Sequence, residues 1–293
     1  MSSNPRIPFE MAHQRRPLAG PEGKTLLVHL VVNVEHWRFG QPMPRKILTA
    51  PHGAEQIPDI PNFSWAEYGM RAGMPRILGM FAERGLPAST SINAGVIDAY
   101  PACAEAMLEA DWEFIGHGIH QKSVQGEQDE AGLVQQALDE LEAFSGRKTR
   151  GWLSPGLKES DDTPDILKRA GVDYVCDWVL DDLPAWMETK HGPLIAMPYN
   201  LEVNDSVIYA VEKHGSPEMF TRLRDTVERF DKEMADGTPR VLALGLHPHL
   251  IGVPHRIGYL EKMLDLLMNR GDTVFMTGSE IADWFVAADR GGK

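Results

Sequence analysis

Short runs of apolar residues alternate along the chain with longer segments of helical periodicity. The longest run, TLLVHLVVNV at residues 25–34, is typical of a parallel strand that is buried on both faces. Shorter apolar runs predict strands at residues 88–93, 112–116, 149–153, 172–176, 194–197, 241–246 and 273–276. Apolar residues spaced three or four apart predict helices at residues 65–84, 133–144, 163–171, 216–234 and 257–267, and a last helix from residue 277.

Local signals mark the start of two helices. Thr163 and Pro164 have the residue types of an N-cap and a first helical position, and Thr277 and Glu280 have the spacing of a capping box. The chain therefore reads as six or seven strand-then-helix units. That order predicts an α/β fold with a mostly parallel sheet, as a distorted (β/α) barrel of about seven units.

The first residues differ from the rest because they are polar and punctuated by proline. We expect residues 1–24 to form an N-terminal arm and residues 25–293 to form a single barrel domain, since single α/β barrels commonly reach about 250 residues. No low-complexity tract or fixed-period repeat interrupts this pattern.

Composition and charge exclude several classes of protein. The 293 residues include 29 Lys and Arg against 42 Asp and Glu, a formal net charge of −13, which argues against binding to nucleic acid or to an anionic membrane. No apolar run approaches the roughly 18 residues of a membrane span, and the N-terminus lacks the apolar core of a signal peptide, so we expect a cytoplasmic protein. Cys103 and Cys176 are expected to be reduced core thiols. No glycine-rich nucleotide-binding motif follows a strand.

Polar clusters follow three predicted strands, at the end where a barrel places its active residues. Glu35 leaves the first strand and is a candidate general base or metal ligand. His117, with a glycine on each side, follows the third strand, and His120 comes three residues later. His247 follows the seventh strand. His249 lies two residues further on, and we expect only His247, which is nearer the strand end, to face the site.

A fourth cluster combines GWLSPG at residues 151–156 with Asn204-Asp205. Backbone N–H groups between Ser154 and Gly156 are candidate donors to an oxyanion. Trp178 and Trp186 flank an acidic loop and are candidate pocket walls, although aromatic side chains more often serve packing.

These clusters together resemble the polysaccharide deacetylase superfamily, and they occur in the order typical of that family. The segments that carry the resemblance are Asn33-Val34-Glu35, Gly116-His117-Gly118, Gly151-Trp152, Asp181-Asp182-Leu183-Pro184, Pro198-Tyr199, Asn204-Asp205, Gly245-Leu246-His247, Leu250-Ile251-Gly252 and Pro254. They are most similar to the metal-independent allantoinase branch. The stretches WEFIGHGIHQ and SPGLK look most like the bacterial cyclic imide hydrolases, or imidases, of that branch.

The resemblance implies a distorted barrel, hydrolysis of a cyclic amide C–N bond, and a homo-oligomer, usually a tetramer. It favours Glu35, His117 and His247 as catalytic residues. The candidate substrate-binding residues are Asn33, Trp37, Gln121, Trp152, Ser154, Gly156, Trp178 and Asn204. The expected partner is a small cyclic imide, with no nucleic acid and no membrane.

The sequence is compatible both with a metal-free site and with a zinc site. Metal-dependent deacetylases carry an Asp-Asp motif and a His-x-x-x-His pair, whereas this chain has Asn33-x-Glu35 and places Gln121 at the second histidine position. A zinc site formed by Glu35, His117 and either His120 or His247 would still have three ligands. We expect no cofactor, with Zn²⁺ as the alternative.

The predicted reaction is ring opening of a succinimide, glutarimide, maleimide or hydantoin-like ring to a half-amide. Water attacks a ring carbonyl, and burial is expected to raise the pKa of Glu35 so that it acts as the base. His247 would polarise the carbonyl or protonate the departing nitrogen, and His117 would orient water or substrate. The alternatives are an allantoinase or other ureide hydrolase, a zinc-dependent carbohydrate N-deacetylase, and a catalytically inactive binding module.

Overall fold

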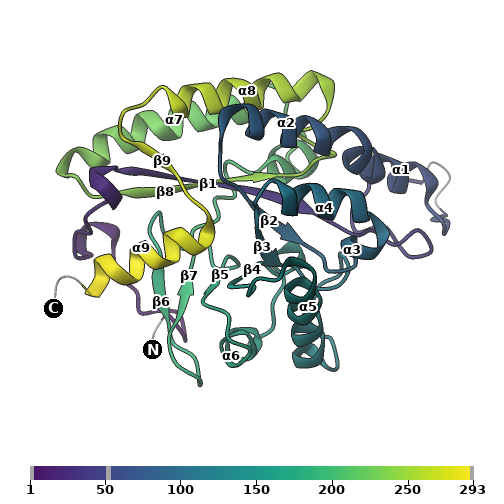
Figure 1. Ribbon diagram of the computed structural model, residues 1–293, viewed down its shortest axis with the longest axis horizontal. Helices are drawn as coiled ribbons and strands as arrows, with labels where there is room; N and C mark the ends of the chain where they lie inside the picture. Colours follow the sequence, from purple (N-terminus) through teal and green to yellow (C-terminus); the bar gives the residue numbers. More distant parts are fainter. Residues whose placement is uncertain (1–2, 51–53, 291–293) are drawn as a thin grey trace.

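The computed structural model describes residues 3–50 and 54–290, which contain a curled nine-stranded sheet (Figure 1). The strands are β1 (Leu26–Val34), β2 (Ser89–Ile92), β3 (Glu113–Gly116), β4 (Gly151–Trp152), β5 (Tyr174–Val175), β6 (Ala185–Met187), β7 (Leu194–Ala196), β8 (Arg240–Leu246) and β9 (Thr273–Phe275). They lie in the order β6-β7-β5-β4-β3-β2-β1-β8, and β9 pairs with β1. Only the β6–β7 pair is antiparallel, so the predicted mostly parallel α/β fold is confirmed.

Helices cover the outside of this sheet and also fill one end of it. The α-helices are α1 (Ile60–Tyr68), α2 (Met74–Arg84), α3 (Val96–Ala99), α4 (Pro101–Glu109), α5 (Glu130–Ser145), α6 (Thr163–Arg169), α7 (Glu218–Glu233), α8 (Pro254–Met268) and α9 (Gly278–Arg290). Figure 1 shows α2, α7 and α8 together on one side of β1 and β8, with α9 on the other side. No helix within the described ranges is long and apolar enough to cross a membrane.

The helix starts confirm one cap prediction and correct another. At α9 the Thr277 N–H donates to Glu280 Oε2 over 2.7 Å and the Glu280 N–H donates to Thr277 Oγ1 over 3.3 Å, which is the predicted capping box. At α6 the cap residue is Asp162, and Thr163 is already helical. The Thr163 hydroxyl is occupied by Glu130 and by the Ser160 N–H, so it does not cap the helix.

The helical segment predicted to begin at residue 65 begins earlier. Asp59 accepts a hydrogen bond from the Asn62 N–H at 3.3 Å and caps α1, and a π-helix, η3 (Gly69–Gly73), joins α1 to α2. The short helices α3 and α4 and the strand β6 were not predicted. Their segments are too short or too weakly periodic to separate from loops by pattern alone.

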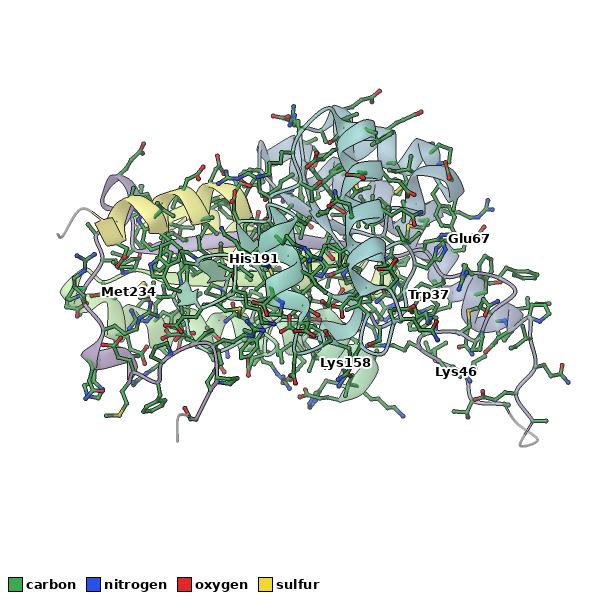
Figure 2. All side chains as sticks on the ribbon, turned by 90° about the horizontal axis from the view of Figure 1, so that it is seen from below. Trp37, Lys46, Glu67, Lys158, His191 and Met234 are labelled. Carbon is green, nitrogen blue, oxygen red and sulfur yellow. The ribbon has the colours of Figure 1, made fainter. Side chains whose placement is uncertain are left out.

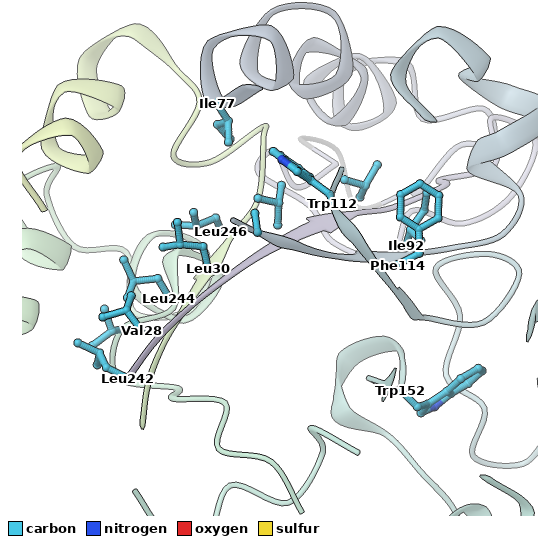
Figure 3. Packing of buried hydrophobic residues seen from close by; sticks show 14 of the residues in the cluster. Val28, Leu30, Ile77, Ile92, Trp112, Phe114, Trp152, Leu242, Leu244 and Leu246 are labelled. Carbon is cyan, nitrogen blue, oxygen red and sulfur yellow. The ribbon is translucent and has the colours of Figure 1, made fainter. Parts of the chain in front are cut away.

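Alternate residues of β1 face two different apolar cores. Val28 and Leu30 pack outward with the helices, and in the register with β8 they lie opposite Leu242 and Leu244 (Figure 3). The interior side of β1 contributes Leu27 and other buried residues to a second core, which includes side chains of α9. Each fully buried leucine contributes about 1.5–3 kcal/mol relative to exposure.

An isolated β-bridge helps to join the two edges of the curled sheet. Asn204, in the segment after β7, pairs with Gly245 of β8. A Cβ on Gly245 would lie 2.4 Å from Asn204 Nδ2 and 2.8 Å from the Tyr199 hydroxyl, so only glycine allows this approach. The bridge therefore brings the segment that begins at residue 204 against the end of β8.

The N-terminal residues pack onto the same body. Arg6 forms a 3.0 Å ion pair with Asp165, and Arg15 forms a 2.8 Å ion pair with Asp181. Leu18 is buried in the core that contains α9. Residues 1–2 of the predicted arm, and residues 51–53 and 291–293 of the predicted domain, lie outside the described residues.

Candidate active site

Three functional side chains continue the interior face of three strands. Residues two apart on a strand share a face, so Glu35 follows the inward side of β1. His117 follows the interior residue Ile115 of β3, and His247 follows Ala243 and Gly245 of β8. The carboxyl ends of these parallel strands point the same way, which brings the three side chains to one end of the barrel.

His247 is fixed between two carboxylates. Its Nδ1 lies 2.6 Å from Asp205 Oδ1, and Asp205 Oδ2 also accepts the His247 N–H at 2.7 Å. On the other side of the ring, Nε2 lies 3.6 Å from Glu35 Oε1. Asp205 is fully buried and directly follows the bridging Asn204, so the closure of the sheet also orients this imidazole.

The two carboxylates decide the charge state of the pair. Burial disfavours the imidazolium of His247, but Asp205 and Glu35 outweigh burial and raise the pKa of His247 to about 9. Burial alone would raise the pKa of Glu35, yet the adjacent charge of His247 lowers that pKa to about 2. The expectation that the pKa of Glu35 rises is therefore wrong, because the sequence does not show the cation that faces it.

Glu35 also receives two neutral donors. Trp37 Nε1 donates to Oε2 over 2.7 Å, and Gln121 Nε2 donates to Oε1 over 2.8 Å. These contacts hold the carboxylate in one orientation and fix the amide of Gln121 with its oxygen directed elsewhere. Trp37 packs edge-on against Trp65 and His249, at centroid distances of 6.1 and 5.5 Å.

His117 and Gln121 each keep a free acceptor. His117 Nδ1 contacts the Leu153 carbonyl, which fixes the proton on Nδ1 and leaves a lone pair on Nε2. Burial lowers the pKa of His117, although Glu35 and the Leu153 carbonyl oppose the shift, so the ring is neutral. Nε2 of His117 and Oε1 of Gln121 are buried and have no hydrogen-bond partner within the described residues. Each of these atoms can accept a hydrogen bond from a bound molecule that carries N–H or O–H groups.

A cavity of about 430 Å³ opens beside Glu35, Gln121 and His247, whereas His117 does not line it. Its lining comes from six separate stretches of chain and comprises Glu35, Trp37, Pro42, Met43, Pro44, Arg45, Gln121, Lys122, Ser123, Pro155, Gly156, Lys158, Ser206, His247 and His249. Figure 2 shows Trp37 and Lys46 toward one end of the molecule, Lys158 near its middle and Met234 toward the other end. The predicted binding residues Trp37, Gln121 and Gly156 are thus part of one cavity wall.

His249 lines this cavity beside His247, although only His247 was expected to face the site. Residues 247–250 form a turn closed by the Leu250 N–H to His247 carbonyl hydrogen bond of 2.9 Å, and this turn keeps both side chains at the cavity. The two rings lie 5.8 Å apart, and burial lowers the pKa of His249 to about 3. A Cβ on Gly69 of η3 would lie 2.5 Å from the His249 backbone nitrogen, so the π-helix packs directly on this turn.

Other predicted binding residues lie beneath or beside the cavity. Asn33 donates to the Tyr199 hydroxyl over 2.9 Å and to the Leu246 carbonyl over 3.2 Å, and Asn204 donates to the same hydroxyl. Trp152 is fully buried, and its Nε1 donates to Ser154 Oγ over 3.0 Å. These side chains support the strand ends and do not line the cavity.

Two further positions are already occupied or face another cavity. The Ser154 N–H donates to Asp177 Oδ1 over 2.8 Å, so of the backbone donors expected there the one that borders the cavity is that of Gly156. Trp178 contacts Glu159 through its Nε1 and lines a separate cavity of about 740 Å³ with Asp177 and Arg6.

Comparison with known proteins shows which families and structures the chain is similar to. The family model described as "Polysaccharide deacetylase" matches residues 65–175. A relative named "Putative polysaccharide deacetylase" from Schizosaccharomyces pombe is 26% identical over 235 residues, which cover 74% of this chain and 73% of that protein. Crystal structures of a probable polysaccharide deacetylase from Pseudomonas aeruginosa PAO1 and of Puue allantoinase each give a TM-score of 0.82 at 25% identity, covering 94% of this chain and 96% of theirs. The chain is therefore similar to polysaccharide deacetylases and to an allantoinase of the same fold.

The side chains at the superfamily's metal-motif positions do not fit a metal ion here. Asn33 turns its amide nitrogen to Tyr199 and Leu246, and both oxygens of Glu35 already accept hydrogen bonds. His120 lies in a different depression, with its Nδ1 3.1 Å from Nδ1 of His36. No three His, Cys, Asp or Glu side chains in residues 3–50 and 54–290 are grouped so that they could hold a metal. We therefore derive the reaction from the side chains alone, without a metal.

Three residues of this site were not predicted from the sequence. Asp205 was present in the motif Asn204-Asp205, and a carboxylate beside a strand-end histidine is the signal that would have found it. His249 was set aside because it lies further from the strand end than His247. Arg45 lies in a long loop without periodicity, and nothing in the sequence pattern points to the site.

Proposed function

We propose that this protein is a hydrolase that opens the ring of small cyclic imides and related cyclic amides to half-amides. The observation that carries the proposal is the charged His247, held by Asp205 and facing Glu35, in a small cavity that is also lined by Gln121 with its unpaired Oε1. The likeness to a structure named as an allantoinase supports a substrate of this ring type.

The attacking water is held by the acceptors of the site. His117 Nε2 and Gln121 Oε1 accept its hydrogen atoms or those of the substrate, and Glu35 Oε1 is the anionic acceptor between Gln121 and His247. A water with several acceptors directs a lone pair outward, toward the ring carbonyl. The Gly156 N–H at the cavity edge is the candidate donor to the oxyanion.

Proton transfer couples the two charged residues. As the water oxygen bonds to the carbonyl carbon, its proton passes to Glu35, and His247 gives its Nε2 proton to the ring nitrogen as the C–N bond breaks. Loss of that proton removes the cation that keeps Glu35 weakly basic, so Glu35 becomes a stronger base as His247 acts. The proton on Glu35 then returns to His247 Nε2 across the 3.6 Å separation, which restores the site.

The chemistry of the leaving group explains why an imide suits this site. The nitrogen of a cyclic imide carries a second carbonyl that delocalises its lone pair, so the bond to the attacked carbonyl breaks more easily than in a simple amide. One general acid and one general base then supply factors of about 10² to 10⁴ each. A cavity of about 430 Å³ accommodates such a ring with a modest substituent.

Two other reactions, hydrolysis of a ureide ring and deacetylation of a sugar, are each supported by one of the similar proteins. A ureide ring such as allantoin is favoured by the allantoinase likeness, and removal of an acetyl group from a sugar is favoured by the name of the Schizosaccharomyces pombe relative. The sharpest experiment is a panel of succinimide, glutarimide, hydantoin, dihydrouracil, allantoin and an N-acetylglucosamine oligomer. We expect kcat/KM to be highest for an imide, whereas turnover of the sugar alone would overturn the proposal.

A further inference from the structure

The cavity carries an excess of positive charge that the ring chemistry does not use. Three of its fifteen lining residues are Lys or Arg and only Glu35 is acidic, in a chain whose formal net charge is −13. Glu35 is balanced by the adjacent His247. The neighbouring cavity of about 740 Å³ has the opposite character, since it is lined by five Asp and Glu residues against Arg6 and Lys190.

The side chain of Arg45 is held in place by Ser206. Its Nη1 donates to the Ser206 carbonyl over 3.1 Å and contacts the Ser206 hydroxyl, and Ser206 directly follows Asp205. Among the described residues no hydrogen bond to Nη2 or Nε is found, and the charge of Arg45 helps to lower the pKa of His249. The guanidinium therefore faces the cavity with donors to spare.

Lys158 supplies the second cation, from a different segment. It is exposed, it follows the turn Pro155–Leu157, and it has no ion pair among the described residues. Lys122 is less available because its ammonium contacts Glu127. Arg45 and Lys158 thus place two positive charges, neither in an ion pair within the described residues, at the wall of the cavity that Glu35 and His247 also line.

We propose that this rim binds a carboxylate carried on the substrate outside the ring, so that the preferred substrates are cyclic imides or ureides with an acidic side chain. The inference rests on the proposed ring-opening function and specifies its substrate class. A carboxylate matches the planar fork of Arg45, and an exposed lysine adds a second charge without a fixed geometry. The new carboxylate of the product forms at the attacked carbon, beside Glu35 and His247, and so is a different group.

The test compares hydantoin with hydantoin-5-acetate, which differ by the acidic side chain. We expect the wild-type kcat/KM to be at least about tenfold higher for hydantoin-5-acetate, through a lower KM, and the preference to shrink at about 0.5 M salt. In the Arg45→Gln and Lys158→Gln double variant this preference disappears, so that the two compounds have similar kcat/KM. Lys46→Gln is the matched control, because Lys46 pairs with Glu55 and does not line the cavity.

Binding separates this inference from the proposed function. Calorimetric titration of the Glu35→Gln variant measures affinity for the two compounds without turnover, and we expect tighter binding of hydantoin-5-acetate that is lost when Arg45 and Lys158 are also replaced. Equal affinity for the two compounds, or an equal loss for both in the double variant, overturns the rim as a carboxylate site. If the charge-dependent binding is present but no ring is opened, the inference stands and the proposed function fails.

Discussion

Asp205 Oδ1 lies 2.6 Å from His247 Nδ1, and this contact holds a buried imidazole in its charged form. The second oxygen of Asp205 accepts the backbone N–H groups of His247 and Ile251 at 2.7 and 3.2 Å, which holds the carboxylate in this orientation. One aspartate thus fixes the position, the tautomer and the charge of the residue that faces Glu35.

Replacing Asp205 with asparagine is expected to reduce kcat by at least about 100-fold, since His247 then loses most of the charge that stabilises its proton. The diagnostic result is a shift of the alkaline limb of the pH profile to lower pH, which a merely structural role would not produce. Circular dichroism checks that the variant is folded. An unchanged pH profile would show that Asp205 does not control the proton on His247.

The wild-type pH profile follows from the direction of two shifts. His247 has a raised pKa of about 9 and must be protonated, so activity is present below that pH and falls as pH rises through it. His117 has a lowered pKa and must be neutral, so activity is retained down to below its usual value of 6.5. We expect kcat/KM for dihydrouracil, whose ring N–H is less acidic than that of succinimide, to be level between about pH 6.5 and about pH 9.

The unpaired Nε2 of His117 can be tested against a histidine three residues away. His117→Gln removes the acceptor and is expected to lower kcat by about 10- to 100-fold. His120→Gln is the matched control and is expected to stay within about twofold of wild type, because His120 faces His36 outside the cavity. A large loss in the His120 variant would instead indicate that it belongs to the site.

The bridge between Asn204 and Gly245 predicts an effect on stability. A methyl group on Gly245 would overlap Asn204 and Tyr199, so Gly245→Ala is expected to destabilise the fold by about 1–3 kcal/mol. Gly258→Ala in α8 is the control, since nothing lies within 4 Å of its added Cβ and alanine favours a helix by up to about 1 kcal/mol. Urea denaturation midpoints compare the two, and equal midpoints would show that the bridge tolerates a side chain.

Much of this architecture could be predicted because β1, β3 and β8 obey simple alternation. Glu35, His117 and His247 each lie at a strand end on the interior face, and parallel strands bring those ends together. The predicted apolar runs correspond to eight of the strands, and the remaining strand, β6, is a three-residue edge strand without a clear pattern.

The sequence-based predictions failed where the role of a side chain depends on contacts between segments that are distant in the sequence. The pKa of Glu35 moves downward because His247 faces it, which no local pattern shows. Trp178 was expected beside the substrate, but its indole N–H contacts Glu159 in the other cavity. His249 enters the site because residues 247–250 turn, and Arg45 enters because an irregular loop is held at Ser206.

The most direct test of the proposed chemistry is succinimide hydrolysis in ¹⁸O-labelled water by protein stripped with a chelator, with metal content measured on the same sample. We predict succinamic acid that carries one solvent oxygen in its carboxyl group, at the rate of the untreated protein. The Glu35→Gln variant should form it at least about 100-fold more slowly. The account is contradicted if no ring is opened, or if activity disappears on stripping and returns with Zn²⁺.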